Sequence, residues 1–214
     1  MSNATPLRPP AFRRSEPDAR RADLIAATAR VLAREGTGGT SVRAIAVEAG
    51  VSPGLVGHYF AGIDALVAAT YAHVEHTVSE ALDAAVAVAG PNPRARLDAF
   101  VTASFSPPIA SGELLATWTA FWSLVRSRPD IARQHDEQYA AFRARLEALL
   151  AECGLPAARL RHAAIAITAL VDGLWLELCL SPVGLSPEAF SADEAGAIAR
   201  SVLDALISTG RSAG

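Results

Sequence analysis

The sequence predicts an all-α protein of about nine helices, because three features of the chain agree. Hydrophobic residues make up 51% of its 214 residues, which is ample apolar material for a core. Alanine, leucine, arginine and glutamate fill the long segments, whereas proline and glycine gather at the ends and in short breaks. No stretch alternates β-branched with polar residues between turn signals, so strands are not expected.

The first 17 residues predict a mobile basic arm, because four prolines interrupt them and three arginines supply positive charge. The first helix is expected over residues 18–35, where apolar side chains repeat on one stripe. Gly36 and the glycines that follow it are expected to end this helix.

Two short helices come next, and capping residues set their limits. Thr40 or Ser41 caps the first of them, which ends at a glycine-containing turn. Ser52 has the place of the next N-cap, and Pro53 occupies the first helical position, where its missing N–H is harmless. Two short helices behind a support helix predict a helix-turn-helix module over residues 18–64.

Six longer helices are expected after this module, in one larger domain over residues 65–214. Residues 163–180 are mostly apolar and come near the lower limit for crossing a membrane. Asp172 and Glu177 would be costly at membrane depth, so a helix covered by protein is expected instead. The expected helices cover residues 62–88, 94–105, 111–126, 130–152, 157–180 and 192–207.

Positive charge is concentrated in the N-terminal module. The chain has a net charge of −3, but residues 1–60 carry +3 and residues 61–214 carry −6. A basic module on an acidic body suits a protein in which one part contacts phosphate and the other has a different task.

A helix that reads DNA enters the major groove with small or hydrogen-bonding residues at its start. The third helix begins Ser-Pro-Gly and ends His-Tyr, while Val56 and Phe60 are expected to turn inward. For His58 and Tyr59, helix capping and packing are the alternative to phosphate contact. The expected DNA-binding residues are Thr40, Ser41, Arg43, Ser52, Pro53, Gly54, Val56, Gly57, His58 and Tyr59.

The run TSVRAIAVEAGVSPGLVGHYFAGIDAL, Thr40 to Leu66, closely resembles the signature of TetR-type repressors. The resemblance implies a homodimer that binds a palindromic operator. Two positions depart from the signature: Gly57 stands where most members have Tyr, and Ile63 where most have Lys. The basic arm could replace these contacts by reaching along the duplex, or it could remain a disordered tail.

All three tryptophans fall in the motifs TWTAFW and LVDGLWLE. The aromatic residues of the first motif share a helix face, as do Asp172 and Trp175 of the second. Facing each other, they would enclose a space with aromatic walls and one carboxylate, as in sites for quaternary ammonium ions. Core packing is the alternative for the aromatic residues, and an arginine partner across a dimer is the alternative for Asp172. The expected ligand-binding residues are Trp118, Phe121, Trp122, Tyr139, Asp172 and Trp175.

The aromatic motifs, together with the small residue before His-Tyr-Phe, resemble BetI-type repressors of choline-to-glycine-betaine genes. This resemblance implies choline or a close relative as effector, and genes of osmoprotectant metabolism as targets. The residues alone leave two alternatives open. One is an uncharged hydrophobic effector in an aromatic pocket, and the other is a non-regulatory helical carrier protein.

Dimerisation is expected through the last two long helices. The helix that contains residues 163–180 is apolar around its circumference and needs cover on several sides. The final helix carries a stripe of small and apolar residues, which permits close helix pairing. Two half-sites about 34–36 Å apart also require two copies of the module. The stripe consists of Ala195, Ile198, Ala199, Val202, Ala205 and Leu206.

Enzymatic activity is not expected. The histidines are scattered, and the pair His73 and His76 near Glu80 is more typical of a solvated helix face than of a metal site. No nucleophile-elbow, Walker or dinucleotide-binding motif is present, so no catalytic residue, metal or cofactor is assigned. Cys153 and Cys179 lack metal or redox spacing, and no signal peptide is recognised, so reduced thiols in the cytoplasm are expected.

Overall fold

The computed structural model describes residues 16–180 and 190–211, and over these ranges it contains nine helices and no strand. The prediction of an all-α fold is confirmed for this part of the chain. Residues 1–15 of the expected arm lie outside the described residues. The helices are α1 (Glu16–Gly39), α2 (Val42–Glu48), α3 (Pro53–Tyr59), α4 (Ile63–Val88), α5 (Pro93–Ala103), α6 (Gly112–Val125), α7 (Pro129–Glu152), α8 (Ala157–Leu180) and α9 (Ala192–Arg211).

Capping residues and glycines end the short helices where the sequence predicts. The Ser41 hydroxyl oxygen caps α2 by accepting a hydrogen bond from the Ala44 N–H at 3.1 Å. Gly36 has a φ of 62°, a left-handed conformation that glycine adopts without steric cost, so the regular part of α1 ends there. Gly50 has a φ of 65° in the turn between α2 and α3, where a larger residue would be strained.

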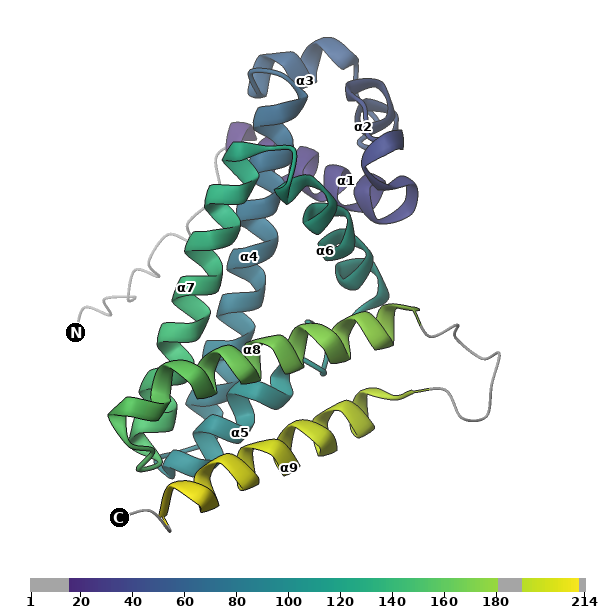
Figure 1. Cartoon of the computed structure of the whole chain (residues 1–214). Helices are drawn as coiled ribbons and strands as arrows, with labels where there is room; N and C mark the ends of the chain where they lie inside the picture. Colours follow the sequence, from purple (N-terminus) through teal and green to yellow (C-terminus); the bar gives the residue numbers. More distant parts are fainter. Residues whose placement is uncertain (1–15, 181–189, 212–214) are drawn as a thin grey trace, which may run out of the picture.

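Helices α1, α2 and α3 pack around a small core that also includes the start of α4 (Figure 1). Two ion pairs tie α1 to α2, because Arg30 and Arg34 both donate to the Glu48 carboxylate, at 2.7 and 3.0 Å. The buried members of this core are Leu24, Ala27, Val31, Ile45, Ala46, Val56, Phe60 and Leu66.

Helix α4 joins this small core to a larger one. Its residue Leu66 is buried in the small core, whereas the next residue, Val67, and Tyr71 belong to the larger core. At the start of α4, Asp64 accepts a hydrogen bond from Arg128 at 2.7 Å, which ties this end to the turn between α6 and α7. The helix is continuous from Ile63 to Val88, so a displacement of one end is transmitted along it.

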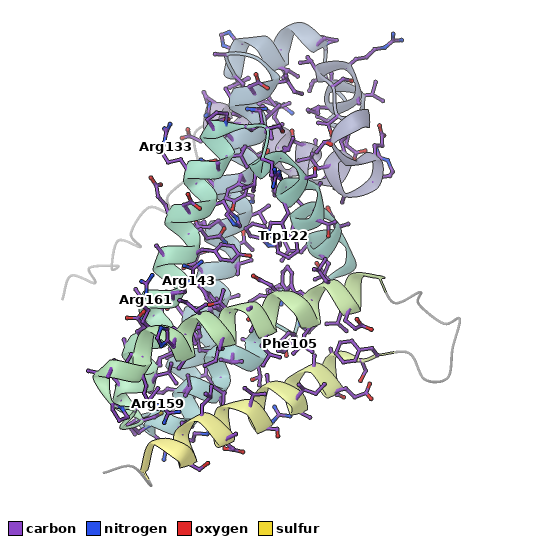
Figure 2. The ribbon with its side chains drawn as sticks, in the orientation of Figure 1. Phe105, Trp122, Arg133, Arg143, Arg159 and Arg161 are labelled. Atoms are coloured by element: carbon purple, nitrogen blue, oxygen red, sulfur yellow. The ribbon has the colours of Figure 1, made fainter. Side chains whose placement is uncertain are left out.

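The larger core is enclosed by α4 to α9. Helices α4 and α7 run side by side, while α5, α8 and α9 lie across the end remote from α3 (Figure 1). Phe105 points into this core and is 2% exposed, whereas Arg133 and Arg161 lie on the outside (Figure 2). This arrangement places the aromatic motifs of α6 and α8 inside the bundle.

The final helix contributes to the core of its own subunit more than the sequence suggests. Ala195 and Ala199, predicted on one dimer stripe, are fully buried within the subunit, so this part of the prediction is wrong. Ile198 from the same stripe is 41% exposed. The neighbouring helix α8 also leaves apolar residues uncovered, since Ile165 is 39% and Leu176 is 40% exposed.

No helix within the described residues combines the length and the apolar character needed to cross a membrane. The apolar helix α8 is instead covered by α6, α7 and α9 on part of its surface.

Candidate functional site

The short helix α3 projects its first turn at the end of the molecule remote from α9 (Figure 1). Ser52 is its N-cap and has an extended backbone, but its hydroxyl makes no capping hydrogen bond. Ser52, Pro53 and Gly54 are all exposed. The Ser52 hydroxyl and the backbone of Gly54 are therefore presented to solvent.

Other predicted DNA-binding residues surround this turn. Arg43, Gly57 and His58 are exposed, and no ion pair involves Arg43 among the described residues. Tyr59 is half-buried, and its ring meets that of His58 edge to face at 5.2 Å. Tyr59 therefore packs against His58 and also exposes part of its side chain at the surface.

Three predicted DNA-binding residues have structural roles in the module. Val56 is 1% exposed and packs in the small core, so its side chain is not part of the surface. The inward orientation of Val56 was predicted, but its assignment as a DNA-binding residue is wrong, because the buried side chain cannot reach DNA. The Thr40 hydroxyl donates to the Gly36 carbonyl at 2.7 Å, and the Ser41 hydroxyl caps α2.

Arginine contacts that the sequence does not predict hold α1 against α3. The Arg21 guanidinium lies 4.1 Å from the centroid of the Phe60 ring and donates to the Tyr59 carbonyl at 2.9 Å. The end of the short helix is therefore fixed by a residue far away in the sequence.

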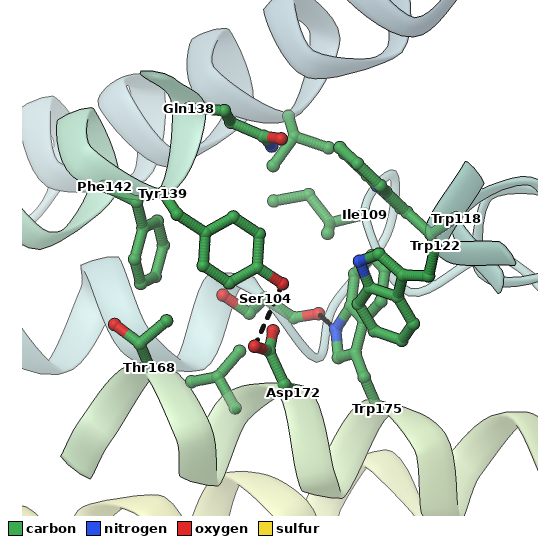
Figure 3. Close-up of a pocket in the computed structure, with 12 residues that line it drawn as sticks. Ser104, Ile109, Trp118, Trp122, Gln138, Tyr139, Phe142, Thr168, Asp172 and Trp175 are labelled. Carbon is green, nitrogen blue, oxygen red and sulfur yellow. Dashed lines mark hydrogen bonds between the residues drawn. The ribbon is translucent and has the colours of Figure 1, made fainter. Parts of the chain in front are cut away.

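A cavity between α4, α6, α7 and α8 brings the two aromatic motifs together (Figure 3). Five of the six predicted ligand-binding residues line it: Trp118, Trp122, Tyr139, Asp172 and Trp175. The complete lining is Val78, Ser104, Ile109, Trp118, Trp122, Gln138, Tyr139, Phe142, Thr168, Val171, Asp172 and Trp175.

Phe121, the sixth predicted residue, does not line the cavity. Its side chain is fully buried and packs against Tyr71 with ring centroids 4.9 Å apart. Phe121 is therefore a core residue, and its assignment as a ligand-binding residue is wrong. It supports Trp118, whose ring centroid lies 6.1 Å away.

Asp172 is the only carboxylate among the described residues that line the cavity. The Tyr139 hydroxyl donates a hydrogen bond to its Oδ2 atom at 2.9 Å (Figure 3). Burial raises the pKa of Asp172 to about 6, although the hydrogen bond from Tyr139 opposes this shift. Asp172 is thus mainly ionised at neutral pH in surroundings that solvate the charge poorly, and a cation would stabilise it.

The two indole N–H groups next to Asp172 differ in their hydrogen bonding. The Trp175 N–H donates to the Ser104 carbonyl at 2.6 Å, which fixes the ring on the cavity wall. The Trp122 N–H is buried and forms no well-aligned hydrogen bond among the described residues, although the Tyr139 hydroxyl is close enough to interact with it. In Figure 3 this nitrogen faces the cavity. A buried donor whose hydrogen bond is incomplete is unfavourable, so a ligand oxygen placed there would be favoured.

Ser104 and Gln138 also line the cavity, and the sequence did not point to either. Ser104 follows the end of α5, and Gln138 precedes the predicted Tyr139 by one residue. Phe142 also lines the cavity and packs on Phe100, with ring centroids 5.0 Å apart. Among the described residues, no group of three metal-binding side chains occurs.

Two family models match the chain. Residues 24–70 match the bacterial regulatory proteins of the tetR family. Residues 93–208 match the C-terminal domain of the BetI-type transcriptional repressors. The two matches divide the chain between the module with α3 and the domain with the cavity.

Curated proteins and solved structures give the same result. The HTH-type transcriptional regulator BetI of Burkholderia mallei (strain NCTC 10229) is 39% identical over 170 residues, which cover 79% of this chain and 87% of the relative. A structure from Pseudomonas aeruginosa PAO1, described as a regulator of transcription, is 42% identical with a TM-score of 0.78, covering 91% of this chain and 93% of that one. A structure of a regulator from Saccharomonospora viridis in complex with choline has a TM-score of 0.72 at 18% identity, covering 87% of this chain and 96% of that one.

Proposed function

The chain belongs to the TetR family, as a BetI-type transcriptional repressor, and we propose that it is a homodimer that binds a palindromic operator and responds to choline or a related quaternary ammonium compound. The observation that carries the choice of effector is the cavity of Figure 3, where aromatic rings lie around Asp172, the one carboxylate that the described residues contribute to the lining. A repressor of this kind works in the cytoplasm, where the chromosome is.

The cavity has the chemistry that a quaternary ammonium group requires. Such a group cannot donate strong hydrogen bonds, so it is bound by the faces of aromatic rings and by an opposite charge. Trp118, Trp122 and Trp175 supply rings, and Asp172 supplies the charge. Each ring contributes about 0.5–2 kcal/mol when the site is dry. The similar fold from S. viridis binds choline, which supports this proposal.

The hydroxyl group of choline also has candidate partners. The Trp122 N–H is a buried donor that forms no well-aligned hydrogen bond among the described residues, and Tyr139 and Asp172 lie at the same end of the cavity (Figure 3). A ligand oxygen that accepts from Trp122 would complete the hydrogen bonding of this donor. The site therefore favours a cation that also carries an oxygen.

DNA recognition is proposed for the exposed start of α3. Ser52 and Gly54 can approach base edges and phosphates, while Arg43 from α2 and His58 contact the DNA backbone. Two copies held about 34–36 Å apart would reach successive major grooves on one side of the duplex.

The dimer is proposed to form through the exposed faces of α8 and α9. These faces carry small and apolar side chains, which allow close helix packing between two subunits. Because Ala195 and Ala199 are used within the subunit, the dimer face of α9 is turned toward Ile198. The exposed residues of the two faces are Ile165, Ala166, Ala169, Gly173 and Leu176 of α8 and Ala197, Ile198, Ser201 and Ala205 of α9.

Effector binding is proposed to act by a population shift. Helix α6 carries Trp118 and Trp122, and its buried Thr117 hydroxyl lies 3.3 Å from the Ala29 carbonyl of α1. A shift of α6 on ligand binding therefore reaches the helix-turn-helix module. A coupling of about 1–3 kcal/mol would lower operator affinity by about 5- to 150-fold.

Titration of the dimer with choline, betaine aldehyde and 3,3-dimethylbutanol tests the choice of effector. The last compound is uncharged but has the shape of choline. All three tryptophans line the cavity, so their fluorescence reports occupancy directly. We expect choline and betaine aldehyde to change the emission at concentrations at which 3,3-dimethylbutanol does not. A stronger response to the uncharged compound would show that the cavity is a hydrophobic pocket and not a cation site.

Replacing Trp175 with Ala is expected to abolish the choline response while sparing operator binding. The change removes one ring from the cavity and its hydrogen bond to the Ser104 carbonyl, but it lies far from α3. A gel shift with the DNA upstream of the gene, with and without choline, measures both properties. If the purified, folded variant lost operator binding instead, Trp175 would belong to the fold and not to the effector site.

Replacing Arg43 with Ala is expected to have the opposite effect. An exposed arginine that donates a charge-assisted hydrogen bond to a backbone phosphate contributes about 1 kcal/mol or more. A dimer loses two such contacts, so operator affinity should fall at least about 30-fold. Choline binding, followed by tryptophan fluorescence, should remain unchanged. Unaltered operator affinity would remove Arg43 from the DNA interface.

A further inference from the structure

We infer that Tyr71 of α4 is the positioning residue that links occupancy of the cavity to the helix-turn-helix module. The inference rests on the proposed function for operator binding and for the identity of the effector. Tyr71 does not line the cavity itself, but it contacts two residues that do, from two different helices.

The ring of Tyr71 packs against α6. It meets the Trp118 ring edge to face, with centroids 5.3 Å apart and an interplanar angle of 86°. It also contacts Phe121, at 4.9 Å. Because Trp118 is a wall of the cavity, a ligand that moves this indole must also move Tyr71 or break the favourable aromatic contact between them.

The hydroxyl of Tyr71 connects to α7. It donates a hydrogen bond to Gln138 Oε1 at 2.8 Å and lies 3.4 Å from His135 Nδ1. Gln138 lines the cavity, and the His135 ring packs at a tilt of 40° against that of Tyr139, with centroids 4.2 Å apart. Tyr139 in turn donates a hydrogen bond to Asp172. Burial raises the pKa of Tyr71, so the hydroxyl keeps its proton and remains a donor at physiological pH.

Tyr71 is thus the point where contacts from both sides of the cavity reach α4. The side chain is 1% exposed, so it cannot relax into solvent when its neighbours move. Leu66 lies five residues earlier on the same helix and is fully buried in the small core beside α3. A displacement of Tyr71 therefore shifts Leu66 and, with it, the core on which α3 rests. Close-packed cores respond to such shifts by switching between arrangements rather than by deforming gradually.

The variant Tyr71→Phe tests this role, because it keeps the aromatic packing and removes only the hydroxyl contacts with Gln138 and His135 of α7. Thr70→Val is the matched control. Thr70 is fully buried on the same helix, but its hydroxyl bonds to the Leu66 carbonyl of its own helix. Both variants lose one buried hydroxyl, yet only Tyr71→Phe loses a contact between helices.

The first readout needs no effector. All three tryptophans line the cavity, so binding of the upstream DNA duplex at the other end of the protein should change their emission in the wild type. We expect Thr70→Val to retain this change. Tyr71→Phe should bind the duplex with affinity within about threefold of the wild type but lose most of the change, because reciprocal coupling is broken.

The second readout is the factor by which saturating choline weakens duplex binding. We expect this factor to fall at least about fivefold in Tyr71→Phe, with the direct affinity for choline nearly unchanged. If choline fails to bind the wild type but the DNA-induced change disappears in Tyr71→Phe, the choline proposal is wrong and the role of Tyr71 stands. Wild-type coupling in Tyr71→Phe, or equal losses in both variants, would overturn the inference.

Discussion

Replacing Asp172 with Asn is expected to weaken choline binding by about 10- to 100-fold, because the cavity loses its only lining carboxylate among the described residues. The amide has nearly the same shape and can still accept the hydrogen bond from Tyr139. Affinity for 3,3-dimethylbutanol should not decrease, since that compound has no charge to pair. Isothermal titration calorimetry with the two ligands separates the charge from the packing. Equal losses for both would show that Asn disturbs the cavity.

The same carboxylate should make effector binding depend on pH. Choline keeps its charge at every pH, so the dependence arises in the protein. Because the pKa of Asp172 is about 6, choline affinity should be about tenfold lower at pH 5 than at pH 8. The His135 ring packs against that of Tyr139, and burial lowers the pKa of His135. The Arg143 guanidinium lies 5.6 Å from the centroid of the same Tyr139 ring. Asp172→Asn should make choline affinity independent of pH over this range. If the pH dependence persists in this variant, it arises from His135.

Asp172→Asn should also stabilise the ligand-free protein at neutral pH. The pKa of this carboxyl rises from 3.8 to about 6 on folding, so the native state holds the proton more tightly than the unfolded chain. The contribution of the protonated Asp172 carboxyl to the free energy of unfolding is complete below about pH 4 and is lost as the pH rises through 6. The variant avoids this loss and should gain about 1–3 kcal/mol at pH 8 but little at pH 4. Urea unfolding at both pH values measures the difference.

Replacing Ile198 with Glu is expected to have a large effect on DNA binding without touching the helix-turn-helix module. Ile198 is 41% exposed on the proposed dimer face of α9, and a two-fold axis would bring two such glutamates into one interface. Burying two like charges costs several kcal/mol, so the dimer should dissociate at micromolar concentration. Operator affinity should then fall at least about 100-fold, because a monomer reads one half-site.

Val88→Glu is the matched control for this experiment. Val88 is also an exposed apolar residue, 88% accessible at the end of α4, but it lies outside the α8 and α9 faces. Sedimentation equilibrium should show a monomer for Ile198→Glu and a dimer for Val88→Glu. A dimeric Ile198→Glu protein with full operator affinity would place the interface elsewhere.

Much of the helical layout could be predicted because its signals are local. Ser41 as a cap and Gly36 as a helix end act within a few residues of their own position, so their effects can be read along the chain. The ion pairs of Arg30 and Arg34 with Glu48 could not be predicted in this way, because they depend on how α1 packs against α2.

Phe121 shows why the lining of the cavity could be predicted only in part. Each helical residue is turned by about 100°, so the third and fourth residues after Trp118 point to opposite sides of its direction. The side of the helix that carries Trp122 faces the cavity, and the side that carries Phe121 faces Tyr71. Periodicity identifies such a face but does not tell which neighbouring helix covers each edge of it. The same limit explains Ala195, which packs within its own subunit rather than on the dimer face.

The two cores that share α4 limit how such proteins can be recombined. A cut before Ile63 would strip the small core of Leu66 and leave its apolar neighbours open to water. A cut after Tyr71 would remove from the larger domain a ring that supports the wall of its cavity. A chimaera that joins the cavity-containing domain of this repressor to the DNA-binding module of another protein therefore has to include the whole of α4. It must also keep the residues of both cores that pack around this helix.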